Sequence, residues 1–334
     1  MPVHAFIFPG QGSQAVGMGR DLAAAFTAAR EVFQEVDDTL SQKLSKLMFE
    51  GPAETLTLTE NAQPALMAVS LATLRVLERE GGVALRDRAV VVAGHSLGEY
   101  SALAAAGAFS IPTAASLLRL RGQAMQKAVP PGEGAMAALI GVDLEQAQAI
   151  CDAAAVIPAA EDGDEAGDGR PAAPAARAVV EPANDNGGGQ VVISGERAAV
   201  ERAVEIARAR GVKRAMLLPV SAPFHCALMA PAAEAMAEAL GRHPPAAPTV
   251  PLIANVSAAK ATDPARITDL LVRQVTATVR WRESVQTMVA LGVDSFVELG
   301  AGKVLSGLVR RIAPDAAAVS AGTPSEIEAV LKVL

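Results

Sequence analysis

The sequence predicts an α/β protein in which a parallel sheet forms the core and a smaller domain is inserted into the chain. Apolar, β-branched runs alternate with helical patterns toward both ends of the chain, which is typical of a parallel sheet covered by helices on both faces. Between residues 132 and about 216 the order of elements becomes β-α-β-β-α-β, the ferredoxin-like order. We therefore expect residues 1–131 and 217–334 to form one large domain and residues 132–216 to form the inserted domain.

Composition and charge limit the class of protein. The chain has 334 residues, of which 51% are hydrophobic and 19% are charged, enough to bury a large core. It has no run of about 20 apolar residues, and residues 3–8 begin a strand where a signal peptide would have a basic region and a long apolar core. We therefore expect a cytoplasmic protein without a membrane partner. The net charge of −7 also argues against nucleic acid as a partner, because nucleic acids bind basic surfaces.

The cysteines and the first loop argue against cofactors. Cys151 and Cys226 lack the spacing of metal ligands, so we expect reduced thiols and no metal. The first strand is followed by the loop Pro9-Gly10-Gln11-Gly12-Ser13-Gln14-Ala15, which partly matches the dinucleotide fingerprint. That fingerprint needs an acidic residue at the end of a second strand, but Glu31 and Glu35 fall inside a helical pattern. We therefore expect no nucleotide cofactor, and a loop that supplies backbone N–H groups.

The other elements follow from apolar periodicity, caps and glycine stops. Ser110 and Asp143 each precede a helical pattern as N-caps. The acidic stretch 159–171 has almost nothing to bury, so we expect a mobile loop there. The expected elements are a helix over 21–36, a helix over 62–80, a strand over 90–94, helices over 97–106 and 111–127, a strand over 135–140, a helix over 144–154, strands over 178–181 and 191–194, a helix over 197–210, a strand over 215–218, a helix over 227–240, a strand near 252, helices over 267–274 and 281–291, a strand over 295–299, a helix from 304 and a final helix ending at 334.

The segment Val90-Val91-Val92-Ala93-Gly94-His95-Ser96-Leu97-Gly98-Glu99-Tyr100 combines a buried strand with the pattern Gly-x-Ser-x-Gly. A strand, a sharp turn and a helix in this order form the nucleophile elbow of the α/β-hydrolase-like fold, in which small neighbours tolerate a strained serine. A chance match of the pattern is the alternative, but the strand before it and the helix after it argue against chance. Ser96 is therefore the candidate nucleophile, and the N-terminus of the next helix is a candidate oxyanion site.

A serine nucleophile needs a base, and the chain has four histidines. His4 opens a strand, His243 lies in a proline-rich connection, and the side chain of His95 is expected to point away from the apex of the elbow. His225 follows a strand in a loop, where catalytic residues of open α/β sheets gather. The alternative for His225 is a helix-start histidine bonded to the backbone. No acidic residue stands at the end of a suitable strand, so the residues alone leave the group that orients His225 unidentified.

Six motifs occur in one order along nearly the whole chain. They are Pro9-Gly10-Gln11-Gly12-Ser13-Gln14, Gly94-His95-Ser96-Leu97-Gly98-Glu99-Tyr100, Leu120-Arg121-Gly122, Gly189-Gln190-Val191-Val192-Ile193-Ser194-Gly195, Pro223-Phe224-His225 and Gly302-Lys303-Val304-Leu305. With these motifs in this order the sequence resembles the malonyl-CoA:acyl carrier protein transacylases of type II fatty acid synthesis.

The resemblance implies a role for each matched residue. Ser96 would be acylated and His225 would be the base. The backbone N–H groups of Gln11 and Leu97 would form the oxyanion hole. Arg121 would bind the malonyl carboxylate, and no cofactor would be needed.

The resemblance also implies what orients the histidine. In this family a main-chain carbonyl does so, and the motif Leu271-Val272-Arg273-Gln274 assigns that carbonyl to Gln274. The chain departs from the family at Thr278-Val279-Arg280-Trp281, where Pro-Val-Arg-Trp is usual, and this change could shift the loop behind Gln274. The acidic stretch 159–171 also lengthens the small domain beyond the family pattern.

The leading hypothesis is a ping-pong acyltransferase in which Ser96 takes malonyl from malonyl-CoA and passes it to the phosphopantetheine thiol of an acidic acyl carrier protein. A serine esterase or thioesterase is the alternative, although a hydrolase of neutral esters has no use for Arg121. A non-catalytic module that docks a carrier is a third hypothesis, against which Ser96 and His225 argue. We expect a monomer. Candidate basic residues for carrier docking are Arg197, Arg202, Arg208, Lys213 and Arg214.

Overall fold

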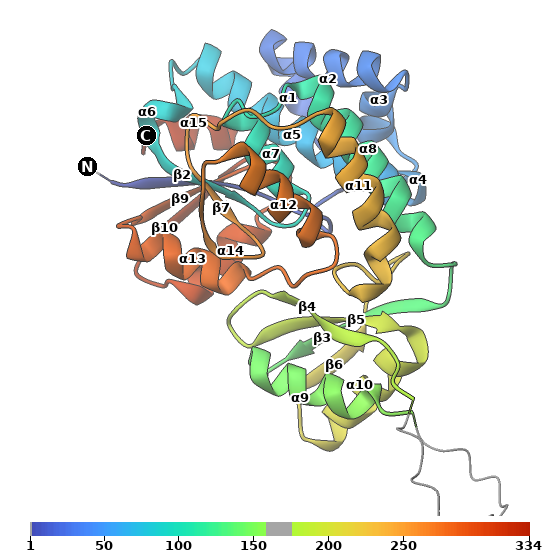
Figure 1. Ribbon diagram of the computed structural model, residues 1–334. Coiled ribbons are helices and arrows are strands. Elements are labelled where there is room, and N and C mark those ends of the chain that lie inside the picture. The colour runs from blue at the N-terminus through green and yellow to red at the C-terminus, as the bar shows by residue number, and fades with distance from the viewer. Residues whose placement is uncertain (1, 158–175) are drawn as a thin grey trace, which may run out of the picture.

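The computed structural model describes residues 2–157 and 176–334, and the mobile loop expected at the acidic stretch 159–171 lies outside them (Figure 1). In the described part of the chain the strands form one sheet of six and one sheet of four. No described helix is both long enough and apolar enough to cross a membrane. The two sheets provide the frame for the site.

The larger sheet agrees with the predicted α/β class and carries one unpredicted edge. Its strands pair in parallel except at β8, which runs antiparallel to β7. The sequence therefore predicted the parallel core but was wrong at this edge. The strand β10 was also missed, because its sequence AAVSA has a single β-branched apolar residue. In spatial order the strands are β10 (Ala317–Ala321), β9 (Ser295–Leu299), β1 (His4–Phe8), β2 (Ala89–Gly94), β7 (Leu252–Ala254) and β8 (Ala259–Ala261).

The strand β1 lies in the middle of the larger sheet and is buried on both faces. Phe6 and Phe8 belong to the hydrophobic cluster on one face, while Ala5 and Ile7 belong to the cluster on the other. This alternation is the two-residue period of a strand. Because both faces are covered, the strand reads as one continuous apolar run.

Most helices cover one face of this sheet. They contribute apolar side chains to the same cluster as Phe6 and Phe8, and Figure 1 shows several of them packed as a layer over the strands. These helices are α1 (Arg20–Ala25), α2 (Thr27–Leu40), α3 (Leu44–Glu50), α4 (Ala53–Thr57), α5 (Thr59–Arg79), α6 (Leu85–Arg88), α7 (Gly98–Ala105), α8 (Ile111–Ala128), the 3₁₀ helix η1 (Ala227–Met229), α11 (Ala230–Arg242), α12 (Pro264–Gln274) and α15 (Pro324–Leu331). The opposite face is covered by α13 (Trp281–Ala290) and α14 (Val304–Ile312).

One helix predicted from the sequence is two helices in the structure. The sequence pattern predicted a single helix over 21–36, but the chain is extended at Phe26, which ends α1 and precedes α2. The N–H of Phe26 donates to the carbonyl of Leu22, so the first helix closes before the second begins. Apolar periodicity continues across the break, and for this reason the pattern alone did not reveal it.

The smaller sheet is antiparallel, with the order β4-β5-β3-β6. One face carries α9 and α10 over a cluster of its own, whereas Met136 and Val192 on the other face join the main core. The strand predicted at 178–181 continues to Asp185. The sequence pattern did not show this, because Pro182 and the polar residues after it are unusual in a strand and mark a bulge. The elements are β3 (Gly134–Ile140), α9 (Leu144–Ala155), β4 (Val180–Asp185), β5 (Gln190–Glu196), α10 (Arg197–Ala209) and β6 (Arg214–Leu217).

Candidate active site

A cleft of about 560 Å³ lies where the smaller sheet meets the carboxyl ends of β1 and β2. Ligands of open α/β sheets bind at this end of the strands. The cleft is lined by Gln11, Ser96, Leu97, Arg121 and His225, which are five of the six site residues predicted from the sequence. The sixth, Gln274, is fully buried and contacts three of them.

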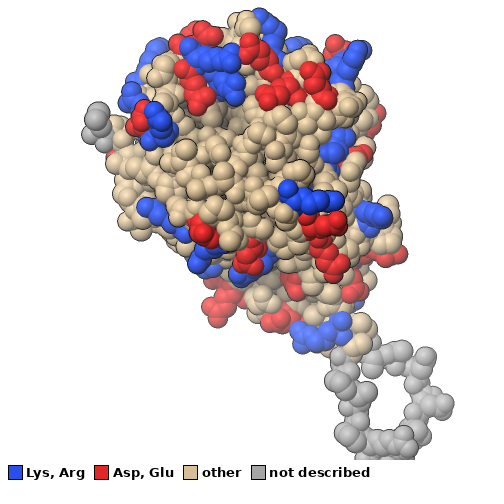
Figure 2. All heavy atoms as spheres, turned by 45° about the horizontal axis from the view of Figure 1, so that its top comes forward, with Lys and Arg blue, Asp and Glu red and all other residues tan. Residues whose placement is uncertain are grey.

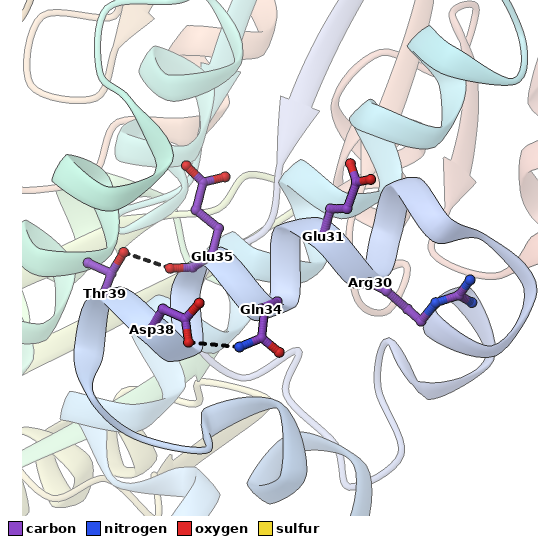
Figure 3. A pocket seen from close by; sticks show the side chains of 6 residues that line it. All are labelled: Arg30, Glu31, Gln34, Glu35, Asp38 and Thr39. Atoms are coloured by element: carbon purple, nitrogen blue, oxygen red, sulfur yellow. Dashed lines mark hydrogen bonds between the residues drawn. The ribbon is translucent and has the colours of Figure 1, made fainter.

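A second hollow, on the outer side of α2, is a poorer candidate for a site (Figure 3). Its six lining side chains come from this single helix. Gln34 donates to Asp38, and the hydroxyl of Thr39 donates to the carbonyl of Glu35. Some of the polar groups that line this hollow therefore already bond within the helix. It holds no candidate nucleophile or base, and we take the cleft around Ser96 as the site.

The sharp turn at Ser96 requires the glycines on both sides of it. Ser96 has a φ of 53°, the left-handed conformation that side chains rarely adopt. A Cβ atom on Gly94 would lie 1.9 Å from the carbonyl carbon of Gly98, and a Cβ atom on Gly98 would lie 2.2 Å from the carbonyl oxygen of Phe8. Both positions therefore exclude every residue but glycine, as the sequence pattern predicted.

The serine and the histidine lie in hydrogen-bond contact. The Oγ atom of Ser96 is 2.8 Å from Nε2 of His225. On the other side of the ring, Nδ1 is 2.8 Å from the backbone carbonyl oxygen of Gln274, which is the last residue of α12. A carbonyl oxygen only accepts hydrogen bonds, so Nδ1 carries the proton and Nε2 is free to accept from the serine.

Burial keeps His225 neutral. The desolvation of the ring, and then the positive charge of Arg121, lower its pKa to about 3. Neutral imidazole is the form that can take a proton from Ser96. The backbone of His225 also has a positive φ, 60°, so both members of the pair are held in strained conformations of the kind found at functional sites.

Two backbone N–H groups near Ser96 are available to an oxyanion. Among residues 2–157 and 176–334, neither the N–H of Gln11 nor that of Leu97 donates a hydrogen bond, and both residues line the cleft. The first loop packs directly on the elbow, because a Cβ atom on Gly10 would lie 2.6 Å from the carbonyl oxygen of His95. Leu97 precedes α7, whose N-terminus carries a partial positive charge.

Arg121 is a buried cation without a bonded carboxylate. Only 1% of the residue is exposed. Its Nη1 donates to Oε1 of Gln63 at 2.9 Å, and its Nη2 donates to Oε1 of Gln274 at 2.9 Å and to Oγ of Ser96 at 3.2 Å. Burial lowers the pKa of Arg121, yet an arginine stays charged in proteins. In the described part of the chain no Asp or Glu forms an ion pair with it, so the cation can accept an anionic ligand.

Sequence reasoning missed a residue that braces the elbow from the neighbouring strand. The side chain of Asn255, directly after β7, accepts from the N–H of Ser96 at 2.8 Å and donates to the carbonyl of Gly94 at 2.6 Å. Its position after a short apolar strand was the available signal, because such positions meet at one edge of a parallel sheet.

Two further buried polar residues were missed, and both interrupt apolar helical runs. Gln63 is 1% exposed and holds Arg121. Glu99 is 1% exposed, and burial raises its pKa to about 7. Its Oε2 accepts from the amide of Gln274. A buried polar side chain within an apolar run was the signal that could have identified them.

The remaining histidines have other partners. His95 lines the cleft, but its Nε2 lies 2.9 Å from Oδ1 of Asn186 and its ring packs near Trp281. His4 is buried in β1, and His243 is exposed. The two cysteines are free and buried. None of these groups contacts Ser96 through a hydrogen bond in the described chain.

The cations predicted to dock a carrier lie away from the cleft. Arg202 and Arg208 bond to backbone carbonyls beside α10, and none of the five candidates lines the cleft. Arg311 of α14 does line it, and among the described residues its one hydrogen-bond partner is Oε1 of Gln190, at 3.4 Å. The face in Figure 2 mixes basic and acidic side chains without a patch of one sign.

Thr278, where the chain departs from the family pattern, bonds through its side chain to the smaller sheet. Its hydroxyl donates to the carbonyl of Pro182 at 2.6 Å. The next residue, Val279, exchanges backbone hydrogen bonds with Ala183 and Asp185. This segment therefore joins the end of α12 to β4 of the smaller sheet.

Comparisons with known proteins agree over the full length. The chain matches the acyl transferase domain family over residues 5–172 and 155–323. It is 45% identical over 333 residues to the malonyl CoA-acyl carrier protein transacylase of Escherichia coli K12, covering 100% of both chains. An acyl-carrier-protein S-malonyltransferase structure from Bartonella henselae has a TM-score of 0.90 and 56% identity, covering 99% of each chain. A malonyl-transacylase in complex with a type II PKS acyl carrier protein has a TM-score of 0.90 and 40% identity, covering 99% of this chain and 100% of its own.

Proposed function

The chain belongs to the malonyl-CoA:acyl carrier protein transacylases, an acyl transferase family, and we propose that it moves the malonyl group through an ester on Ser96. As a member of this family it transfers malonyl from coenzyme A to acyl carrier protein. The assignment of each step to a side chain is our proposal, and it is supported by the contacts around Ser96.

In the first half-reaction the Oγ atom of Ser96 attacks the thioester carbonyl carbon of malonyl-CoA while Nε2 of His225 takes the hydroxyl proton. The carbonyl oxygen becomes an oxyanion that accepts from the N–H groups of Gln11 and Leu97. The C–S bond then breaks, and the coenzyme A sulfur leaves with the proton from His225. Malonyl remains as an ester on Ser96.

The second half-reaction reverses these steps with another thiol. The phosphopantetheine thiol of the carrier gives its proton to His225 and attacks the ester carbonyl. The same two N–H groups stabilise the oxyanion. When the C–O bond breaks, Ser96 recovers the proton from His225, and malonyl leaves as a thioester of the carrier protein.

One observation carries the choice of a malonyl group, namely the buried charge of Arg121 beside Ser96, which bonds to no carboxylate in the described chain. Burying a charge is costly unless an opposite charge meets it. The terminal carboxylate of malonyl supplies that charge, and the planar guanidinium can bind it with two parallel hydrogen bonds. A hydrolase of neutral esters would gain nothing from this cation.

Intact-protein mass spectrometry tests the proposal. On incubation with malonyl-CoA we expect the mass of one malonyl group to appear on the protein, and to disappear when phosphopantetheinylated carrier is added. The carrier should gain the same mass. Loss of the adduct to water without a gain on the carrier would favour the thioesterase alternative, and no adduct at all would favour a docking module.

We also propose that residues 132–216 form a ferredoxin-like domain inserted into an α/β-hydrolase-like domain. The order β3-α9-β4-β5-α10-β6 supports this division, as does the separate hydrophobic cluster under α9 and α10. The division has a functional meaning, since the substrate cleft lies where the two parts meet.

A further inference from the structure

Two buried amide side chains hold the guanidinium of Arg121. The Oε1 atoms of Gln63 and Gln274 each accept one of its hydrogen bonds, both at 2.9 Å. Buried arginines usually pair with carboxylates, whereas both of these partners are neutral. An amide oxygen fixes the direction of the guanidinium without cancelling its charge.

We propose that Gln63 and Gln274 form a neutral cradle that positions Arg121 and leaves its charge for the acyl group. In this inference the two amides act as positioning residues, and they set the preference for acyl groups that end in a carboxylate. The inference rests on the proposed function, because it takes Arg121 as the site of the substrate carboxylate.

Gln274 also separates Arg121 from a buried carboxyl group. Its Oε1 faces Arg121, while its Nε2 donates to Oε2 of Glu99 and to the carbonyl of Ser96. A flipped amide would turn a donor toward the guanidinium, which only donates. The amide is therefore locked as an acceptor toward Arg121, and Glu99 is kept from pairing with it.

Gln63 is the better position for a test. It comes from α5 and bonds to Arg121 but not to Ser96 or His225, and its Nε2 faces the sulfur of Met125 at 3.7 Å. Gln63→Glu keeps the shape of the side chain and places a carboxylate against Nη1 of Arg121. That carboxylate would neutralise the cation and compete with the substrate for it.

The experiment compares kcat/KM for malonyl-CoA and for acetyl-CoA with phosphopantetheinylated carrier as acceptor. The variants are Gln63→Glu, Gln63→Met and Arg121→Ala. Gln123→Glu is the matched control, because it adds the same charge at an exposed position of the same helix as Arg121. We expect Gln63→Glu to lower the malonyl-to-acetyl ratio about ten- to a hundredfold, the effect of one charged hydrogen bond. Gln63→Met should lower it less, and Gln123→Glu should leave it unchanged.

A folded Gln63→Glu enzyme with the ratio of the wild type, or with the ratio of Gln63→Met, would overturn the neutral cradle. Arg121→Ala separates this failure from a failure of the proposed function. If Arg121→Ala changes the ratio and Gln63→Glu does not, the cradle alone is wrong; if neither changes it, Arg121 does not bind the carboxylate. Should Gln63→Glu fail to fold in thermal unfolding, Gln63→Met carries the test, because it removes the amide oxygen from Nη1 of Arg121 without adding a charge, and an unchanged ratio there overturns the cradle.

Discussion

The Nη2 atom of Arg121 lies 3.2 Å from Oγ of Ser96 and also donates to Gln274. A cation thus touches the atom that we propose as the nucleophile, in a site where its charge has no carboxylate partner. The same charge contributes to the low pKa of His225. The chemistry of acyl transfer and the choice of acyl group are therefore linked through one side chain.

Ser96→Ala is the most direct test of the nucleophile. The variant removes the only hydroxyl at the apex of the elbow, and alanine is smaller, so we expect the fold to remain intact. The malonyl adduct should disappear from the intact-protein mass spectrum. An adduct that persists in the folded variant would show that another residue is acylated.

The roles of His225 and Gln274 are separated by two alanine variants. His225→Ala removes the base and should lower transfer of both malonyl and acetyl groups. Gln274→Ala keeps the carbonyl that fixes the histidine tautomer, so we expect it to cost far less in acetyl transfer. It removes the amide bonded to Arg121, so malonyl transfer should fall more than acetyl transfer. Equal losses of acetyl transfer in both folded variants would contradict this division of roles.

The stability of the protein should depend on pH through Glu99. Its pKa is raised from 4.5 to about 7, mainly by burial and against the pull of its hydrogen bonds and of Arg121. Between these values the folded state keeps a proton that the unfolded state has lost, so this contribution to stability is lost as the pH rises. Over the whole range this loss in the free energy of unfolding is about 3 kcal/mol.

Glu99→Gln removes this titration, while His225 and His95 titrate alike in both proteins and cancel in the comparison. Urea unfolding of wild type and variant should therefore give a difference in unfolding free energy that shifts in favour of the variant between about pH 5 and about pH 8. A constant difference across this range would show that Glu99 does not titrate there.

The sequence predicts features that depend on neighbouring residues better than features that depend on contacts between distant parts of the chain. The elbow was predicted because strand, glycines and helix all lie within a few residues of Ser96. Arg121 and Gln274 entered only through the family resemblance. Gln63 and Asn255 were missed because their roles come from contacts to residues 58 and 159 positions away, which no local pattern contains.

Secondary structure shows the same contrast. The helix capped by Asp143 was predicted because its N-cap is a local signal. The structure adds a capping box with Gln146. The break at Phe26 and the strand β10 were not, because packing rather than propensity determines them. His225 was predicted as the base from its place after a strand of an open α/β sheet, but that reason was wrong, because β6 belongs to the antiparallel sheet. The residue itself does contact Ser96, and its partner carbonyl belongs to α12.

Carrier recognition should depend on Arg311 rather than on the five cations of α10, β6 and the turn between them. Arg311 lines the same cleft as Ser96, and we expect the carrier to be acidic. We expect Arg311→Glu to raise the KM for carrier protein, since it reverses a charge on the lining of the cleft. The matched control is Arg214→Glu on β6, an exposed position outside the cleft. A larger effect of Arg214→Glu would return the docking surface to the smaller sheet.

The choice of acyl group rests on Arg121, and one variant measured with two substrates tests it. Malonyl differs from acetyl by a terminal carboxylate, and in this buried site that charge needs the guanidinium. Arg121→Ala removes two charged hydrogen bonds to the carboxylate, each worth roughly 1.5–3 kcal/mol. We therefore expect it to lose about 3 kcal/mol of transition-state stabilisation, which lowers kcat/KM for malonyl-CoA about 10²-fold. Acetyl transfer should persist or improve, because a neutral acyl group leaves the buried cation unpaired. Parallel losses for the two substrates would make Arg121 a structural residue and remove the physical basis for malonyl specificity in this site.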